Sequence, residues 1–477
     1  MAETAGFTVG LEIHVRLNTP HKIFCYCPNR ADGAPNTHTC PVCLGLPGTL
    51  PVLNPEVKEP ALRLALALGC TIARVSEFSR KNYFYPDLPR NYQITQQRWP
   101  LATGGQLEEV GLERIHLEED AGRSRHQDGG WNLVDLNRAG TPLAEIVTLP
   151  QLRDGAGARR VLARLRQLVR YLGISDGDME KGSLRCDANV GLGPGHSQAG
   201  PWVEVKNLNS LRFVQKAVDQ EIQRLGKALA CGQPLRRQTR GWDPRTGQTY
   251  AQRLKEELAD YLYFPEPDLP PLVISAAAIE AVRRNQPELP GARQARYEES
   301  WGLSRDDAAT LCRTPQLADY FDTTVQELRT RGFREADGAA EAARWILSRV
   351  LAAVDGKDES LKVIPLQPSG LAALLAARLD GRRTRQQILT IWEPAMRGED
   401  PVSLVEREVP PGPSREQIQT LAQQILARDA HLVARFQAGN PALLNHFLGN
   451  VMQATKGRAE PRTVKEILLE LLAGFSP

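Results

Sequence analysis

The pattern of apolar residues changes near residue 275, and this change restricts the chain to a fold built from separate parts. Up to that point, stretches with period-two alternation are interspersed with helical stretches and short polar links, which predicts mixed α and β structure. Beyond it, strand signals nearly vanish and segments rich in Ala, Leu and Arg predict helices. Because 477 residues exceed a single core of usual size, we expect two or three domains.

One strand of the first part can be assigned residue by residue. Residues 7–15 alternate apolar side chains with polar ones, so Glu12 and His14 lie on the same face of the predicted strand. Further strands are predicted at residues 113–119, 132–137, 142–147, 183–190 and 202–208. Helices are predicted at residues 60–68, 158–172 and 211–230, the last of them behind a cap at Asn209 or Ser210.

The helical part is predicted to divide again at a proline-rich segment, residues 410–413. Before this segment, helices are predicted at residues 306–312, 339–354 and 371–379. After it, Ser414 and Gln417 have the spacing of a capping box. The last two helices are predicted at residues 443–455, ended by Gly457, and 464–472, led by Pro461 and a Thr463 cap. We therefore expect domains at residues 1–280, 281–412 and 413–477.

The composition is that of a globular protein, with 42% hydrophobic and 24% charged residues. A formal net charge of +3 leaves the class of partner open, because any contact with nucleic acid must come from local patches or partner subunits. The first ten residues have neither a basic start nor an apolar run, and no 18 apolar residues are contiguous. We expect a cytoplasmic protein that does not enter a membrane.

Four of the eight cysteines, Cys25, Cys27, Cys40 and Cys43, lie within nineteen residues. Their spacing, C-x-C-x12-C-x2-C, is typical of the two knuckles of a tetrahedral zinc site. Four thiolates leave no open coordination position, so such a site would be structural. The alternative is a set of unrelated reduced thiols, since a cytosolic chain keeps few disulfides. The other four cysteines are predicted to be small core side chains.

Acidic residues gather on three of the predicted strands. Glu145 lies on a strand of otherwise apolar character, where a buried carboxylate needs a cationic partner. Residues 118–120 are three adjacent acids at a strand end, and Glu12 with His14 forms a third set. Such ligands from several strands suit Mg²⁺, which keeps waters and substrate phosphates in its coordination shell. The alternatives are a solvated acidic strand end and an ion pair between Glu145 and an arginine.

Two further segments combine charged and polar side chains. Ser183, Arg185, Asp187 and Asn189 share one face of a predicted strand, which either lines a cleft or faces solvent. Residues 79–85, which include a lysine at position 81, mix cations with aromatic rings. They either bind phosphates and stack on bases or sugars, or pack as a turn on their own domain. The signature G-x-x-x-x-G-K-[ST] is absent, so phosphate chemistry would need a less common site.

Motifs ordered along nearly the whole chain carry a family resemblance. They lie at residues 9–15, 35–38, 40–48, 80–89, 114–122, 137–140, 183–190 and 206–210. The first reads VGLEIHV, the fourth RKNYFYPDLP and the seventh SLRCDANV. Together they resemble the GatB family, the B subunits of heterotrimeric amidotransferases that convert misacylated Glu-tRNA(Gln) or Asp-tRNA(Asn).

The resemblance implies an α+β fold: a mixed α/β cradle catalytic domain, an all-α helical domain and a small helical tail similar to YqeY proteins. The tail signature matches residues 449–457. The implied reaction is phosphorylation of the side-chain carboxylate of the misattached Glu or Asp by ATP, followed by attack of ammonia. The amidase (glutaminase) partner of the heterotrimer would supply the ammonia, and its small third partner would clamp the two larger proteins together. The sequence does not distinguish Asp-tRNA from Glu-tRNA as substrate.

The resemblance also implies roles for particular residues. His14, Glu119 and Glu145 would hold Mg²⁺ around the ATP phosphates, with Glu12 nearby. Contacts with phosphate, substrate or a second metal ion are implied for Lys81, Arg185 and Asp187.

Strand alternation complicates one of these assignments. It puts Glu118 on the face of His116 and Glu119 on the opposite face, so only one of the two acids can be a ligand. The family match favours Glu119. The chain also departs from the family pattern at Leu262, where an arginine is usual, and in residues 191–202, which are shortened.

Two other functions fit parts of the pattern. A non-catalytic RNA-binding scaffold would use the cysteines as a zinc knuckle and the aromatic turns as RNA contacts, but it needs no acid cluster. A free-standing kinase or ligase of a small carboxylic acid would need neither the tail nor a partner protein.

Overall fold

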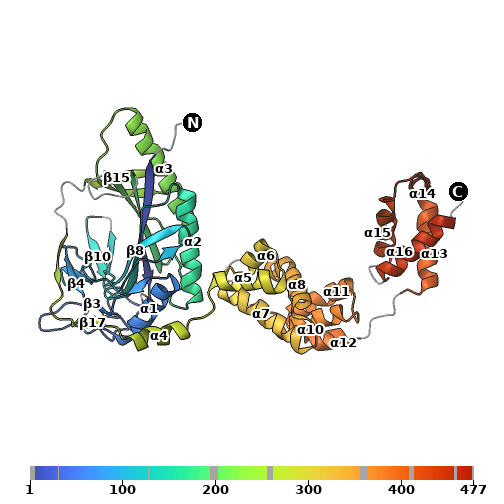
Figure 1. Ribbon diagram of the computed structural model, residues 1–477, viewed down its shortest axis with the longest axis horizontal. Helices are drawn as coiled ribbons and strands as arrows, with labels where there is room; N and C mark the ends of the chain where they lie inside the picture. Colours follow the sequence, from blue (N-terminus) through green and yellow to red (C-terminus); the bar gives the residue numbers. More distant parts are fainter. Residues whose placement is uncertain are drawn as a thin grey trace. The chain divides into compact units, whose positions relative to one another are not determined.

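The computed structural model describes residues 6–30, 32–126, 129–193, 202–254, 261–354, 364–407, 413–455 and 459–474. Contacts divide the chain into two compact units, Met1–Ala292 and Arg293–Pro477. The first unit is a mixed α and β structure, and the second is helical throughout its described residues (Figure 1). The α+β fold class predicted from the sequence is therefore confirmed.

The elements of the first unit are mostly strands. Its longer strands are β1 (Phe7–Arg16), β8 (Val110–Glu119), β11 (Pro142–Thr148), β12 (Leu184–Leu192), β13 (Trp202–Lys206), β14 (Gln238–Asp243) and β15 (Gln248–Leu254). Its shorter strands are β2 (Thr71–Ile72), β3 (Val75–Ser76), β4 (Ser79–Asn82), β5 (Tyr92–Thr95), β6 (Ala102–Thr103), β7 (Gln106–Leu107), β9 (Arg123–His126), β10 (Asn132–Asp135), β16 (Leu262–Pro265) and β17 (Leu272–Val273). Its helices are α1 (Lys58–Ala67), α2 (Gly155–Tyr171), α3 (Leu211–Ala230) and α4 (Ala276–Arg284), with a 3-10 turn, η1 (Pro55–Val57).

The main sheet has the strand order β15-β14-β13-β12-β1-β11-β8-β6-β2, with β7 also paired to β8. Only β13 and β14 run parallel; the other neighbours are antiparallel. The central strand β1 places His14 opposite Arg185 of β12 on one side and opposite Glu145 of β11 on the other. Glu145 in turn lies opposite His116 of β8, so four polar side chains form one row across the sheet.

One face of this sheet is closed by α2 and α3, which lie along the same side of it (Figure 1). Val9, Leu11 and Ile13 of β1 are fully buried in the resulting core. Both helices begin at side-chain caps, because Asp154 accepts from the N–H of Gly157, and Ser210 accepts from the N–H of Phe213. Strand alternation then puts Glu12 and His14 on the opposite, polar face, as predicted.

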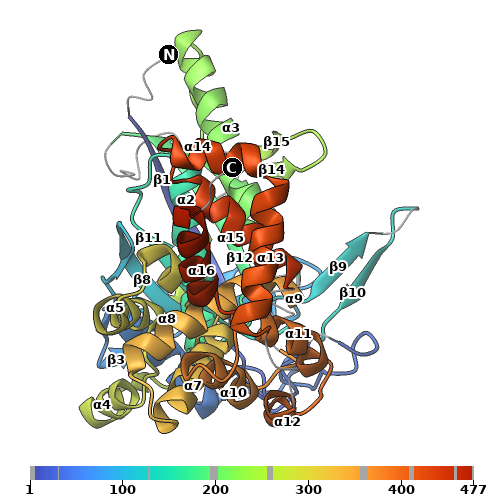
Figure 2. The same cartoon turned by 90° about the vertical axis from the view of Figure 1, so that its right-hand side faces the viewer.

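Two small sheets and a hairpin accompany the main sheet. The order β16-β4-β5 forms a three-stranded sheet, and β17 pairs with β3. The hairpin β9–β10 joins β8 to β11 and stands clear of the other strands in Figure 2. These strands have only two to four residues, too few for a periodic pattern; the sequence predicted β10, at residues 132–137, but not the others.

The second unit is built from helices. They are α5 (Pro290–Trp301), which crosses the division between the units, α6 (Arg305–Leu311), α7 (Pro315–Thr330), α8 (Glu335–Trp345), a π-helical turn η3 (Ile346–Val350), α9 (Leu351–Ala353), α10 (Pro368–Leu379), α11 (Arg385–Met396), α12 (Pro401–Glu406), α13 (Arg415–Arg428), α14 (Ala430–Gln437), α15 (Leu443–Ala454) and α16 (Pro461–Gly474). The π-helical turn interrupts the single helix predicted at residues 339–354. Among the described residues, no helix combines the length and the apolar character that a membrane span requires.

The buried residues of the second unit form two clusters. One runs from Tyr297 to Val405 and the other from Ile418 to Leu472. The predicted capping box of Ser414 and Gln417 begins α13 and is confirmed. The predicted Thr463 cap is wrong, because α16 already begins at Pro461.

Some of the predictions fall on parts of the chain that the structure does not describe. Residues 410–412 of the proline-rich segment, Gly457, and residues 194–201 of the shortened segment lie outside the described residues. The domain limits at residues 280 and 412 stay predictions.

Candidate active site and metal centre

A histidine and two carboxylates meet on the polar face of the main sheet. His14 Nε2 lies 3.1 Å from Glu118 Oε1 and 3.3 Å from Glu145 Oε2. One ligand atom from each of the three residues lies within 4.8 Å of the others, a spacing that could hold a metal ion. The three side chains come from adjacent strands, β1, β11 and β8, so the register of the sheet brings them together.

The charges of this cluster compensate one another. Burial disfavours the charged imidazolium, but Glu145 and Glu118 outweigh it and hold the pKa of His14 well above its usual range. Burial would also raise the pKa of Glu145, yet His116 and His14 hold that pKa well below its usual range. The two carboxylates thus stabilise positive charge at His14 Nε2, and a metal ion could take the place of the proton there.

Histidine 116 extends the cluster on the side of β8. Its Nε2 lies 3.3 Å from Glu145 Oε2 and 3.9 Å from Glu118 Oε2. Its Nδ1 is buried and has no hydrogen-bond partner among the described residues. Thr95 Oγ1 donates to Glu118 Oε2 at 3.3 Å, so β5 also orients this carboxylate. Neighbouring side chains thus hold both Glu118 and Glu145 in place without a ligand.

The structure does not bring Glu119 into the cluster, which corrects its assignment with His14 and Glu145. Glu119 Oε2 lies 2.6 Å from Arg90 Nη2, and Glu119 Oε1 accepts the backbone N–H of Ile94 at 3.0 Å. Burial, offset in part by Arg90, raises the pKa of Glu119. Adjacent residues of a strand face opposite ways, so Glu118 takes the inward position and Glu119 ties β8 to β5.

A second row of polar side chains crosses the sheet at Glu12, two residues before His14 in β1. Asn189 Nδ2 donates to Glu12 Oε1 at 2.9 Å, and Lys206 Nζ lies 2.9 Å from Asp187 Oδ2 and 3.0 Å from Glu204 Oε1. Burial raises the pKa of Glu12, and the nearby acids Glu145, Glu204 and Asp187 raise it further. This row adjoins the His14 cluster because Glu12 and His14 share the same face of β1.

Arg185 of β12 flanks the His14 cluster and contacts Asp120, the residue that follows β8. Its Nη2 lies 2.6 Å from Asp120 Oδ2, and Arg138 Nε lies 3.4 Å from the same oxygen. The Nε of Arg185 is buried without a hydrogen-bond partner among the described residues. The Arg185 side chain as a whole is 35% exposed, so its guanidinium can still donate to an anionic ligand on the polar face. The alternative of an arginine paired with Glu145 is wrong, because histidines take that place.

Lys81 reaches the same face from the small sheet. Burial would lower its pKa, but Glu118, Tyr263 and Glu145 together raise it, which keeps the ammonium charged. Its Nζ lies 4.8 Å from the ring centroid of Tyr261. The neighbouring Arg80 is used elsewhere, because its guanidinium binds Glu266 through two hydrogen bonds of 2.8 and 2.9 Å. Leu262, which lies opposite Asn82 in this sheet, is 66% exposed.

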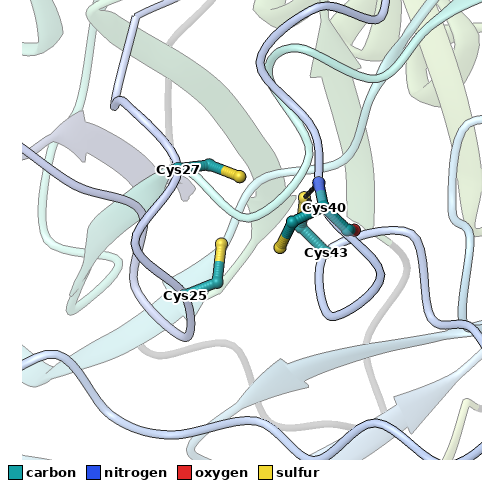
Figure 3. A group of neighbouring side chains, drawn as sticks. All are labelled: Cys25, Cys27, Cys40 and Cys43. Carbon is teal, nitrogen blue, oxygen red and sulfur yellow. Dashed lines mark hydrogen bonds between the residues drawn. The ribbon is translucent and has the colours of Figure 1, made fainter.

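The four clustered cysteines converge in the loops that follow β1. Their sulfur atoms lie within 4.8 Å of one another, and Figure 3 shows the Cys25 and Cys27 side chains facing those of Cys40 and Cys43. Cys43 Sγ accepts the N–H of Cys40 at 3.2 Å and the ammonium of Lys22 at 3.6 Å. The hydrogen bond from Cys25, helped by these two donors, lowers the pKa of Cys43 to about 5. Four sulfur donors with one stabilised thiolate fit a closed, tetrahedral metal centre.

Comparisons with known proteins connect this geometry to a family. Residues 7–280 match the model of the GatB/GatE catalytic domain, and residues 319–472 match that of the GatB domain. The chain belongs to the GatB/GatE family. The catalytic-domain match includes both the His14 cluster and the four cysteines, so both sites lie within the part that defines the family.

Curated relatives match this GatB/GatE chain over nearly its whole length. The proteins from Persephonella marina and Geotalea daltonii are 41% and 43% identical to it, covering 97% and 98% of this chain and 98% and 99% of their own. The protein from Moorella thermoacetica is 42% identical, covering 97% of this chain and 99% of its own. Each is named as the B subunit of an aspartyl/glutamyl-tRNA(Asn/Gln) amidotransferase.

Sequence reasoning gave no role to several residues of this site. His116 carried a signal, since it lies two residues before Glu118 on one strand and so shares its face. Arg138 and Lys206 gave no comparable signal, because their contacts depend on which strands pair. Of the residues predicted, the structure brings His14 and Glu145 together, with Glu12, Lys81, Arg185 and Asp187 around them.

Proposed function

We propose that this chain is the B subunit of a tRNA-dependent amidotransferase, which converts misacylated Glu-tRNA(Gln), Asp-tRNA(Asn) or both to the correctly amidated forms. The observation that carries the proposal is the cluster of His14, Glu118 and Glu145 within a chain that is similar to such proteins from end to end. The chemistry of these side chains suits activation of a carboxylate by a nucleoside triphosphate.

The proposed reaction has two steps. A side-chain carboxylate oxygen of the misattached residue attacks the γ-phosphorus of ATP, and the bond from that phosphorus to the bridging oxygen breaks to release ADP. Ammonia then attacks the carbonyl carbon of the acyl phosphate, phosphate leaves with the bonding electrons, and the new nitrogen loses a proton. A carboxylate alone is a poor electrophile, and the phosphate gives ammonia a leaving group to displace.

The residues present fit Mg²⁺, the metal ion we propose for this site. His14, Glu118 and Glu145 would hold it, because two carboxylates and one imidazole leave room for water and phosphate oxygens. When bound, such an ion neutralises charge on the transferred phosphoryl group. Phosphoryl transfer depends mainly on positioning and on cations, and Lys81 and Arg185 would supply two of these to the phosphates.

The second polar row has a supporting part in this proposal. Glu12 and Asp187 would face the substrate or a second metal ion, since they lie beside the cluster on the same sheet face. Lys206 Nζ lies 2.9 Å from Asp187 Oδ2 and so offsets the charge of this carboxylate. The four cysteines would hold a structural Zn²⁺ away from the reaction.

The proposed partners complete a heterotrimer, in keeping with the names of the relatives. We propose an amidase (glutaminase) protein as the source of ammonia, a small third protein that clamps the other two, and misacylated tRNA as the substrate. The YqeY-like tail at residues 413–477 would hold part of the tRNA. The cytoplasmic location remains a prediction.

One assay tests this proposal. The chain is incubated with ATP and misacylated tRNA, with and without its amidase partner, and amidated product and ADP are followed. We expect amidation with glutamine only when the partner is present, and amidation with ammonium in both cases. ADP release with small carboxylic acids and no tRNA would favour a free-standing ligase, and RNA binding without ADP release would favour a scaffold.

A further inference from the structure

Exposed aromatic and apolar side chains gather on the small sheet β16-β4-β5 and the turn that follows β4. Their exposed fractions are high for such residues: Phe84 83%, Leu262 66%, Tyr85 51%, Tyr261 40% and Phe264 39%. Single exposed apolar residues need no explanation, but a group of them on one edge marks a binding surface. The active-site chemistry described above uses none of these five side chains.

This aromatic patch is joined to the active site by direct contacts. Tyr83 packs against Tyr85 and Tyr261, with ring centroids 5.7 and 5.5 Å apart. The Lys81 ammonium lies 4.8 Å from the Tyr261 ring on one side and faces the acids of the cluster on the other. The aromatic patch therefore adjoins the proposed site of the reacting carboxylate.

Hydrogen bonds hold the small sheet against the strand that carries Glu118. The Tyr83 hydroxyl donates to Gln93 Oε1 at 3.1 Å, and Gln93 Nε2 donates to the backbone carbonyl of Glu119 at 2.7 Å. Thr95, on the same strand as Gln93, donates to Glu118 itself. A ligand on the patch would thus be held in a fixed position relative to the cluster.

We infer that Phe84 and Tyr85, with Leu262 of the paired strand β16, form a stacking platform for the unpaired 3′-terminal bases of the RNA substrate. This inference rests on the proposed function, in which the reacting carboxylate is attached to the 3′ end of an RNA. When the carboxylate reaches the cluster, the terminal bases must lie within one or two nucleotides of it. Aromatic rings bind unpaired bases by stacking.

The shape of the platform favours RNA over the base of ATP. Sites for small nucleotides are concave and enclose most of the ligand. Phe84 is 83% exposed, so it offers an open surface suited to the end of a larger molecule. Lys81 is the cation at its inner edge, whereas Arg80 is neutralised by Glu266 and Asp268. Attraction to the RNA backbone is thus concentrated on the side toward the cluster.

Leu262 gives the inference a second test. It is exposed within the patch at a position where an arginine would add a phosphate contact, so this chain should rely more on stacking and less on charge. Leu262→Arg should tighten RNA binding and steepen its salt dependence by about 0.7 in the logarithmic slope, the value for one added contact with a single strand.

The experiment measures binding of an uncharged acceptor-stem RNA hairpin with a single-stranded 3′ end to the full chain in its complex, by fluorescence anisotropy at several salt concentrations. We expect Phe84→Ala to weaken binding roughly tenfold with an unchanged salt slope, since the loss of one stacked base costs about that much. Tyr85→Ala should act in the same direction. Trp99→Ala is the matched control, because Trp99 is 49% exposed on the same unit, and its binding should equal that of the unchanged chain.

The possible outcomes separate the inference from the proposed function. If the unchanged chain amidates tRNA and Phe84→Ala binds the RNA as tightly as Trp99→Ala does, the platform inference is overturned while the proposed function stands. A raised KM for ATP with unchanged RNA affinity would assign the patch to the ATP base and also overturn it. If the unchanged chain amidates no tRNA, the proposed function itself fails. Circular dichroism of each variant shows that it is folded.

Discussion

Glu118 and Glu119 are neighbours in the chain but bind on opposite faces of β8. Glu118 Oε1 lies 3.1 Å from His14 Nε2, whereas Glu119 Oε2 lies 2.6 Å from Arg90 Nη2. One carboxylate therefore belongs to the candidate active site and the other to the contact that joins β8 to the small sheet. The two residues have the same chemistry and different surroundings, so they form a matched pair for mutation.

The first prediction concerns Glu118. Glu118→Gln should lower amidation on the order of a hundredfold or more, because it removes a charge that would stabilise a metal ion and the phosphoryl transition state. His14 keeps Glu145 as a partner, so the thermal unfolding midpoint should fall less than in Glu119→Gln. Added ammonium should not restore activity, since in the proposed complex the amidase partner, and not this site, would produce ammonia. Full rescue by ammonium would place Glu118 in ammonia delivery instead.

The second prediction concerns Glu119. Glu119→Gln leaves the buried Arg90 guanidinium without its counter-charge, which should cost on the order of 3 kcal/mol in unfolding free energy. Urea unfolding measures this loss. At a temperature where the variant is folded, its amidation rate should remain within a few-fold of the unchanged chain. A hundredfold loss of rate in a fully stable variant would reverse the assignments of the two acids.

The choice between these two acids shows what the sequence could predict. Period-two alternation in β1 was strong enough to place Glu12 and His14 on one face, and alternation in β8 paired Glu118 with His116. The family match, however, favoured Glu119, which the structure places on Arg90 and outside the cluster. Only the register of β8 against β11, with His116 opposite Glu145, decides which one faces His14.

Helices were predicted more closely than the small strands. The bounds of α3, Leu211–Ala230, match the prediction because a Ser210 cap and a long apolar period mark both of its ends. The two-residue strands β2 and β3 carry no period, and they form only because other strands supply hydrogen-bond partners. Lys81 lies on another short strand, β4, whose partners are β5 and β16, so its place in the site also needed the structure.

The third prediction concerns Lys81. Lys81→Met should raise the KM for ATP and lower the amidation rate by at least about tenfold, because a buried cation beside the phosphates is lost. Lys81→Arg keeps the charge and should retain more activity than Lys81→Met. Steady-state kinetics with ATP as the varied substrate measure both effects. Equal activity of the methionine variant and the unchanged chain would show that Lys81 serves only to pack against Tyr261.

The fourth prediction concerns the tail. Its helices α13 to α16 enclose their own buried cluster, so deletion of residues 413–477 should leave the rest of the chain folded. The truncated chain should show a raised KM for tRNA, while glutamine hydrolysis by the partner stays intact. Amidation at several tRNA concentrations gives this value. An unchanged KM would assign the tail to another role.

The fifth prediction links the cysteine centre to the hairpin β9–β10. The backbone N–H of Asn36 donates to Asp135 Oδ1 at 3.1 Å, and Asn137 Oδ1 accepts the N–H of His38 at 2.8 Å. The hairpin root is thus fixed to the segment that leads into Cys40. A two-stranded hairpin is only marginally stable by itself, so its order should depend on that segment. Loss of the metal ion should therefore loosen the hairpin.

We expect about one Zn²⁺ per chain by metal analysis of freshly prepared, reduced protein, and Cys40→Ser should release it. Amide hydrogen exchange should then become faster in β9 and β10 and stay slow in α2, which packs on the far face of the sheet. Cys231→Ser is the control, because Cys231 lies outside the cluster and is exposed, so that its predicted place in the core is wrong. Both the zinc content and the exchange should be unchanged. Zinc-free protein with a fully protected hairpin would show that hydrogen bonds alone order this segment, and the structural role of the metal would be wrong.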